Sequence, residues 1–239
     1  MIVPSKRIRI GLILPSVNVF IEPELNRIAP KDFTFHATRV LLTETTPEAL
    51  IQMENDLDYA CRLIASVVPK AVAYACTSGS FIKGLKWDKQ ITEKIEQLVG
   101  CPAVTTSSVM IRALKALNIK SVAVATPYID RVNEMEKKFL EDNGFNVPVI
   151  KGLQITDAEI LHAQTADTIY EMVVSMDSKE VDGFFISCTD FRGLEVVDRL
   201  EKKLKKPVIT SNQATLWGLF KLVNYKGKIK GFGRLLEEV

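Results

Sequence analysis

The chain has few of the features that mark nucleic-acid-binding, membrane or disulfide-rich proteins. Its 31 basic and 29 acidic residues nearly cancel to a net charge of +2, which gives no electrostatic footprint for DNA or RNA. No apolar run approaches the roughly 20 residues that a membrane-spanning helix needs. Four cysteines among 239 residues are too few for a disulfide framework. These absences predict a reduced, cytoplasmic protein that binds neither nucleic acid nor membrane.

Motifs for metals and nucleotides are also scarce. The two histidines, His36 and His162, form no ligand-spaced cluster, and we expect each on the surface of a helix or strand. The chain has no Walker motif, and Gly231-Phe232-Gly233 lacks the third glycine of a dinucleotide fingerprint. No Gly-x-Ser-x-Gly nucleophile elbow occurs. The sequence therefore predicts no metal site and no cofactor.

Short apolar runs that alternate with helical patterns fill most of the chain. Hydrophobic residues make up 47% of it, enough for a large core. Continuous apolar runs are typical of parallel strands that helices cover on both faces. The expected strands are Ile8–Leu14, Phe33–Arg39, Ala71–Ala75, Ala103–Thr105, Ser121–Ala125, Val147–Lys151, Gly183–Ser187 and Val208–Thr210.

The two halves of the chain share one spacing. Pro15 ends an apolar run and precedes Cys76 by 61 positions, and Pro127 precedes Cys188 by the same 61. Each of these cysteines also ends an apolar run and is followed by threonine. A third pair of matching segments is Pro102-Ala103-Val104-Thr105-Thr106-Ser107 and Pro207-Val208-Ile209-Thr210-Ser211-Asn212. The pattern indicates a duplicated half-domain with one cysteine at the same place in each copy.

A duplication of this kind predicts an α/β fold of two Rossmann-like lobes related by a pseudo-twofold axis. Each lobe would have a roughly four-stranded parallel sheet flanked by helices. We expect residues 1–113 and 213–239 in the first lobe and residues 114–212 in the second. Ligands of open α/β sheets bind beyond the carboxyl ends of the strands, where both prolines and both cysteines fall. The active site is therefore expected between the lobes.

The cysteine segments carry the expected chemistry. Cys76-Thr77-Ser78-Gly79-Ser80 follows a buried strand and opens a helix, whose N–H groups and hydroxyls could hold a carboxylate or an enediolate oxygen. The same donors predict a lowered pKa for the Cys76 thiol. A lone cysteine is more often a small core residue, as we expect of Cys61 and Cys101. The equal spacing instead favours a shared function for Cys76 and Cys188.

At these residues the chain resembles the aspartate/glutamate racemase superfamily. Within it, the chain is most similar to the branch of maleate cis–trans isomerases, arylmalonate decarboxylases and ectoine-utilisation racemase-like proteins. The motifs that carry the resemblance run through nearly the whole chain in the family's order. They are Gly11-Leu12-Ile13-Leu14-Pro15-Ser16-Val17-Asn18, Tyr74-Ala75-Cys76-Thr77-Ser78-Gly79-Ser80-Phe81, Thr126-Pro127-Tyr128, Ser187-Cys188-Thr189 and Thr210-Ser211-Asn212-Gln213-Ala214.

The resemblance implies a cofactor-independent enzyme in which Cys76 and Cys188 act on opposite faces of a substrate carbon. It also implies that a small carboxylate is the substrate. The residues that would bind it are Pro15, Ser16, Asn18, Thr77, Ser78, Tyr128 and Thr189. Two of them also have a purely structural interpretation. Asn18 could be a helix N-cap with no further role, and Tyr128 could be a ring that fills the interface between the lobes.

Several functions remain open at this stage. The resemblance favours racemisation or isomerisation by proton transfer between two cysteines, because arylmalonate decarboxylases carry glycine at the first cysteine position. Maleate cis–trans isomerisation through covalent addition of Cys76 is an alternative, although those isomerases use an asparagine in the region where this chain has Ala158. Decarboxylation with Cys188 alone as proton donor is another. A non-catalytic ligand-binding protein or thiol redox sensor is an alternative of a different class, and for each we expect a homo-oligomer.

Overall fold

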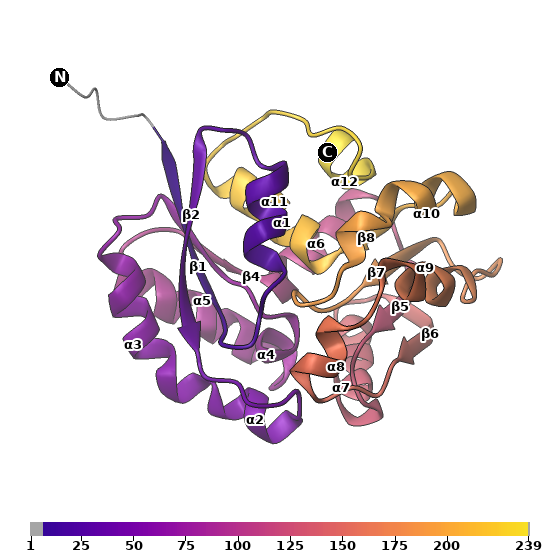
Figure 1. The fold of residues 1–239 in the computed structure, drawn as a ribbon, viewed down its shortest axis with the longest axis horizontal. Helices are drawn as coiled ribbons and strands as arrows, with labels where there is room; N and C mark the ends of the chain where they lie inside the picture. The colour runs from indigo at the N-terminus through magenta and orange to yellow at the C-terminus, as the bar shows by residue number, and fades with distance from the viewer. Residues whose placement is uncertain (1–6, 239) are drawn as a thin grey trace.

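The computed structural model describes residues 7–238, which form two four-stranded parallel sheets (Figure 1). The first sheet has the strand order β2-β1-β3-β4 and the second has β6-β5-β7-β8. The two orders match strand for strand, which confirms two similar α/β lobes. The strands are β1 (Ile8–Pro15), β2 (Phe33–Val40), β3 (Ala71–Tyr74), β4 (Ala103–Thr105), β5 (Ser121–Thr126), β6 (Asn146–Gly152), β7 (Gly183–Ile186) and β8 (Val208–Thr210).

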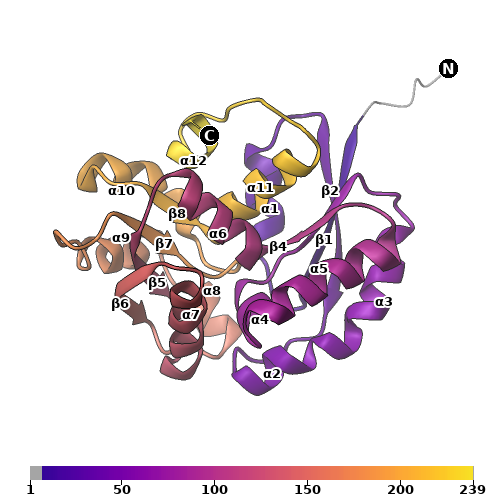
Figure 2. The ribbon, with the colours of Figure 1, turned by 180° about the vertical axis from the view of Figure 1, so that it is seen from behind.

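The inner strands are buried on both faces because helices cover each sheet from both sides (Figures 1 and 2). Every residue of β3 and β7 is buried, in agreement with their continuous apolar runs. The helix coverage is close at Gly11, where an added Cβ would lie 2.7 Å from the Cγ1 atom of Ile64. A side chain larger than hydrogen at this position would push the covering helix away from β1.

The helices of the first lobe alternate with its strands. They are α1 (Ile21–Ile28), α2 (Pro47–Gln52), α3 (Glu54–Ala65), α4 (Thr77–Phe81), α5 (Leu85–Val99) and α6 (Thr106–Ala116). Thr46 caps α2 by accepting a hydrogen bond from the Ala49 N–H at 3.4 Å. Gly100 ends α5 in the left-handed conformation with φ +76°, which glycine adopts at little cost.

The second lobe repeats this alternation. Its helices are α7 (Asp130–Asp142), α8 (Ala158–His162), α9 (Ala166–Val174), the 3₁₀ segment η1 (Gly193–Glu195) and α10 (Val197–Leu204), and α11 (Ser211–Leu222) and α12 (Arg234–Glu238) complete the described chain. Among the helices of residues 7–238, none is both long and apolar enough to cross a bilayer.

Helices α6 and α11 join the two lobes. Each follows the last strand of its sheet and begins with a threonine capping box, at Thr105 and Thr210 respectively. They pack so closely that a Cβ added at Gly218 would lie 2.1 Å from the Cγ1 atom of Val109. Figures 1 and 2 show α11 between α6 and α1, and it contacts β3 and β4 of the first sheet. The expected boundary at 113/114 falls inside α6, and the assignment of residues 213–239 to the first lobe stays a prediction.

The carboxyl ends of both sheets meet along one seam. The Thr189 hydroxyl crosses the seam and donates to the Ala75 carbonyl at 3.0 Å. The Thr45 N–H crosses it again and donates to the Thr156 carbonyl at 3.1 Å. The first bond holds the ends of β3 and β7, and therefore both cysteine segments, against one another, and the second joins the segments that follow β2 and β6.

Candidate active site

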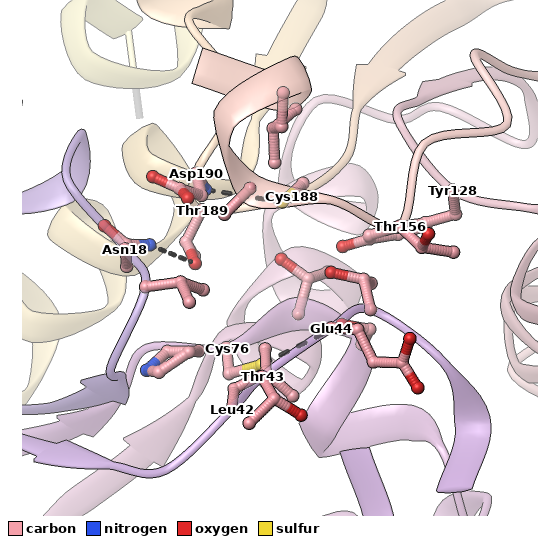
Figure 3. A pocket seen from close by; sticks show the side chains of 17 residues that line it. Asn18, Leu42, Thr43, Glu44, Cys76, Tyr128, Thr156, Cys188, Thr189 and Asp190 are labelled. Carbon is pink, nitrogen blue, oxygen red and sulfur yellow. Dashed lines mark hydrogen bonds between the residues drawn. The ribbon is translucent and has the colours of Figure 1, made fainter. Parts of the chain in front are cut away.

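A small cavity lies on this seam between the two lobes (Figure 3). Its free volume is about 20 Å³, which is room for about one water molecule. Both Cys76 and Cys188 line it, one from each lobe. The lining residues are Pro15, Val17, Asn18, Leu42, Thr43, Glu44, Thr45, Cys76, Thr77, Ser78, Tyr128, Thr156, Ala158, Leu161, Cys188, Thr189 and Asp190.

Eight of the nine residues chosen from the sequence are in this lining, and Ser16 is not. The Ser16 hydroxyl instead accepts the Leu42 N–H at 3.0 Å and donates to the Leu42 carbonyl at 3.1 Å. Ser16 therefore fixes the start of the segment that supplies Leu42, Thr43, Glu44 and Thr45 to the cavity wall. The two other cysteines lie away from the cavity: Cys61 is fully buried and Cys101 is half-buried.

Cys76 occupies the N-cap of α4 with an extended backbone, φ −143° and ψ 111°. Its Sγ accepts a hydrogen bond from the Gly79 N–H at 3.2 Å and lies 3.8 Å from the Ser78 hydroxyl. The glycine is required by this geometry, because a Cβ at position 79 would lie 2.9 Å from the same sulfur. The Cys-Thr-Ser-Gly sequence thus places a thiol where the first N–H groups of a helix point toward it.

Cys188 follows β7 and has a different backbone. Its φ is +90°, a left-handed value that side chains other than glycine rarely adopt. Its Sγ accepts a hydrogen bond from the Asp190 N–H at 3.4 Å. Cys188 keeps more exposed surface than Cys76, which is only 3% exposed.

The predicted low pKa of Cys76 is wrong for this closed cavity. Burial raises the pKa of the Cys76 thiol to about 11, and the Gly79 N–H and the Ser78 hydroxyl offset only part of that rise. Burial also raises the pKa of Cys188, and the neighbouring Asp190 carboxylate raises it further. Both sulfurs are therefore thiols at neutral pH, and Cys76 is the easier of the two to deprotonate.

Tyr128 contributes a hydroxyl to the cavity wall, beside Cys188 and Ser78. Its side chain is 1% exposed. Burial raises the pKa of Tyr128 well above its ordinary value, with the neighbouring Cys188 and Glu136 adding to the rise. The phenol therefore stays neutral and can donate to an anion that enters the cavity.

Asn18 lines the cavity and also holds the start of α1, while its binding of a carboxylate stays a prediction. Its Oδ1 accepts the N–H groups of Phe20, the N-cap residue of α1, at 3.2 Å and of Ile21 at 3.1 Å. Its Nδ2 donates to the Thr189 hydroxyl at 3.0 Å, across the seam. The Thr77 hydroxyl is also engaged, because it donates to Ser211 at 2.8 Å. These side chains are thus held in place before any ligand arrives.

Asp190 and His162 form a contact that the sequence did not predict. His162, expected on a surface, is half-buried, and its Nε2 lies 2.8 Å from Asp190 Oδ2. Asp190 Oδ1 accepts the N–H groups of Val19 at 2.8 Å and Phe20 at 3.3 Å, in the opposite lobe. The only signal in the sequence was the position of Asp190 two residues after Cys188.

The charge of the cavity wall is unusual for a carboxylate site. The charged side chains in the cavity wall are the carboxylates Glu44 and Asp190. The wall contains no lysine, arginine or histidine. Within residues 7–238, no three metal-ligating side chains gather closely enough to hold an ion. An anion in this cavity would be held by neutral donors alone, namely hydroxyls and backbone N–H groups.

Two like α/β lobes that present one cysteine each to a shared cavity define the architecture of the aspartate/glutamate racemase superfamily. Within that class, the chain belongs to the arylmalonate decarboxylase family, which it matches over residues 10–236.

Three relatives illustrate the similarity. The arylmalonate decarboxylase of Bordetella bronchiseptica is 30% identical, with 96% of each chain covered. The maleate isomerase of Pseudomonas putida is 26% identical over 95% of this chain and 96% of its own. The crystal structure of the maleate isomerase of Pseudomonas putida S16 with maleate has a TM-score of 0.92 and 26% identity, and the match covers 96% of this chain and 97% of that one.

Proposed function

We propose that the chain is a cofactor-independent isomerase or racemase that moves a proton on a small carboxylic acid by means of Cys76 and Cys188. The observation that carries the proposal is that two thiols, one from each lobe, line a single cavity (Figure 3). The maleate bound to the Pseudomonas putida S16 relative supports a small carboxylate as the substrate class.

Cys76 is proposed as the base. Its sulfur faces the Gly79 N–H and the Ser78 hydroxyl, which favour a negative charge on it. As a thiolate it takes the α-proton and becomes a thiol, and the electron pair of the broken C–H bond moves into the carboxylate to form an enediolate. The burial that raises its pKa also makes the thiolate a stronger base once it forms.

Cys188 is proposed as the acid. The Asp190 carboxylate close to it disfavours a second negative charge, so the Cys188 proton is retained. Its thiol gives that proton to the opposite face of the carbon and becomes a thiolate, which completes the inversion. Because the protons of the two thiols are coupled, the pair titrates as one unit.

The enediolate needs donors that are already in place. Tyr128 has a neutral hydroxyl in the cavity wall, and the first N–H groups of α4, at Thr77 and Ser78, have no acceptor within the helix. One such donor is worth on the order of 3 kcal/mol in a transition state. Pro15, Asn18 and Thr189 complete the binding wall, while Ser16 acts on it indirectly through Leu42.

Cis–trans isomerisation of maleate is the second candidate, supported by the similarity to maleate isomerases. In this reaction the Cys76 thiolate adds to one alkene carbon and the Cys188 thiol protonates the other. Rotation about the new single bond is followed by loss of the same proton to Cys188 and release of Cys76. Ala158 lines the cavity in the region where the resemblance to those isomerases implies an asparagine, which favours the first candidate.

The test is a substrate screen in D2O. The purified protein is incubated with chiral α-substituted acids, maleate and arylmalonates, and the products are followed by NMR. We expect deuterium at the α-carbon of one acid together with loss of its optical rotation. Fumarate from maleate would favour the second candidate, and CO2 release from a malonate would overturn the two-thiol proposal. If no acid is turned over and the number of free thiols falls on mild oxidation, the result would favour a redox sensor.

We also propose that the protein is a cytoplasmic homo-oligomer. The four cysteines of the chain are all free, as is usual in a reducing compartment. Symmetric homo-oligomers are common among soluble enzymes. Light scattering of the purified protein measures the assembly size, and a monomer across the tested concentrations would contradict this proposal.

A further inference from the structure

A buried glutamate recurs at the same place in each half of the chain. Glu24 on α1 and Glu136 on α7 are 112 positions apart (136 − 24), as are Cys76 and Cys188 (188 − 76). Glu24 is 6% exposed and Glu136 is 0% exposed. Because a carboxyl group is costly to bury, two of them at matching positions call for an explanation beyond packing.

Glu136 holds the residue before Cys188. Its Oε1 accepts a hydrogen bond from the Ser187 hydroxyl at 2.6 Å, and its Oε2 has no partner among the described residues. Burial raises the pKa of Glu136 to about 8. A neutral carboxylic acid thus faces Ser187 at physiological pH.

Glu24 holds the residue after Cys188 through one intermediary. Its Oε2 accepts from Nδ2 of Asn212 at 2.7 Å, and the same nitrogen donates to the Thr189 carbonyl at 3.1 Å. Burial raises the pKa of Glu24 to about 7, although Arg27 and Arg192 lower it in part. Asn212 belongs to one of the repeated segments of the sequence, and this contact gives that segment a role.

The hydrogen bonds of the two glutamates therefore lead to the same strained turn, one on each side of Cys188. Ser187 and Thr189 flank Cys188, whose φ of +90° is unfavourable for a residue with a Cβ. The corresponding turn at Cys76 is extended, with φ −143°, and needs no such support. Position 75 of the first lobe, which corresponds to 187 (187 − 75 = 112), is accordingly alanine rather than serine.

We propose that Glu136 and Glu24 are positioning residues for Cys188: Glu136 holds it through Ser187, and Glu24 holds it through Asn212 and Thr189. Together they keep the Cys188 sulfur in the cavity wall opposite Cys76. The turnover part of this inference rests on the proposed function, whereas the position of the sulfur does not.

The experiment compares Glu136→Leu, Glu136→Gln, Ser187→Ala and Glu24→Leu with the unchanged protein. Ser187→Ala gives the second lobe the residue that the first lobe has at the matching place. The control is Glu201→Gln, because Glu201 Oε1 accepts the Val208 N–H at 2.9 Å at the opposite end of the same sheet. For each variant, iodoacetamide labelling of Cys188 and of Cys76 is followed by peptide mass spectrometry, and kcat and KM are measured on the acid found in the screen.

We expect Glu136→Leu and Ser187→Ala to label Cys188 about threefold faster or more, with Cys76 unchanged, because the turn relaxes outward. Their kcat should fall about ten- to hundredfold, with KM within about twofold, as a small misplacement of a reacting group predicts. Glu136→Gln should stay within about threefold of the unchanged protein, since its amide oxygen still accepts from Ser187. Glu24→Leu should show the same pattern more weakly, because it acts through Asn212.

Unchanged labelling of Cys188 and unchanged kcat in folded Glu136→Leu would overturn the proposal for Glu136. If Glu136→Leu does not fold, Ser187→Ala decides instead, because it deletes one hydroxyl and leaves the core intact. If the unchanged protein turns over no acid, the proposed function fails, and the labelling ratio alone still supports or overturns the positioning of Cys188. Equal effects of Glu201→Gln would show a general loosening of the lobe and would also overturn it.

Discussion

The surroundings of Cys76 and Cys188 differ although their positions in the two lobes match. Cys76 caps a helix in a relaxed extended conformation and faces the Gly79 N–H and the Ser78 hydroxyl. Cys188 sits at φ +90° beside the Asp190 carboxylate. The matching positions place one sulfur on each side of a cavity, and the differing neighbours make one sulfur easier to ionise. The duplication thus accounts for the two cysteines at matching positions, and the local differences in sequence account for their different tendencies to ionise.

The largest effect is expected when each thiol is removed in turn. Cys76→Ser and Cys188→Ser should each lower isomerisation about a thousandfold or more, because a serine hydroxyl is too weak an acid to exchange a proton at this rate. Turnover is measured by deuterium uptake. Cys101→Ser is the control, since Cys101 lies outside the cavity, and it should stay within about twofold. Full turnover in Cys76→Ser would leave only a one-thiol reaction.

The pH dependence tests which ionisation matters. The pKa of Cys76 is raised to about 11 by burial, and the reactive form is the deprotonated one. The value of kcat/KM should therefore rise with pH, by about tenfold per unit between about pH 7 and pH 10. The profile is recorded with checks of folding at each pH. A plateau below about pH 8 would mean that an opened or ligand-bound cavity restores an ordinary thiol pKa.

Gly79→Ala tests whether the start of α4 holds the Cys76 thiol in place. The added Cβ would lie 2.9 Å from the Cys76 sulfur and 3.0 Å from the Tyr74 hydroxyl. We expect kcat to fall about tenfold and the free energy of unfolding to fall by about 1–3 kcal/mol, as for other overpacked cores. Kinetics and denaturant unfolding measure the two effects. Normal kcat with normal stability would show that α4 shifts freely and does not hold the thiol.

Asp190→Asn tests how the neighbouring carboxylate acts on Cys188, and we expect a weaker effect than from the changes above. Loss of the carboxylate charge should lower the pKa of Cys188 toward its ordinary value, because Asp190 is one cause of its rise. Labelling of Cys188 at a fixed alkaline pH should become about threefold faster. Asp182→Asn is the control, because Asp182 accepts the Ser121 N–H at 3.0 Å at the far end of the sheet. An unchanged labelling rate would show that burial alone sets the pKa of Cys188.

The fold and the place of the site could be predicted because both depend on spacing. The 61-residue interval from Pro15 to Cys76 recurs from Pro127 to Cys188, and strand ends of like lobes meet at one seam. The helical spacing of Leu50, Met53, Leu57, Cys61 and Ile64 by itself predicts one helix after Thr46, whereas the structure divides it at Met53 into α2 and α3. Such a break depends on local packing and leaves the apolar period intact.

Other features of the site depend on contacts between lobes, which spacing does not encode. The raised pKa of Cys76 follows from closure of the cavity, whereas the sequence shows only the helix start that would lower it. Asp190 and His162 come together from separate segments. The acids Glu24 and Glu136 look like surface charges of helices until the structure shows both of them buried.

The bond from Thr45 to Thr156 has a consequence for how fast the protein can work. It joins two residues of the cavity wall, one from each lobe, so any motion that separates the lobes at this point has to break it. If entry of the substrate or release of the product needs that separation, and the separation is slower than the chemistry, it sets kcat. A ligand that contacts both lobes would add to this link and raise the melting temperature with its concentration.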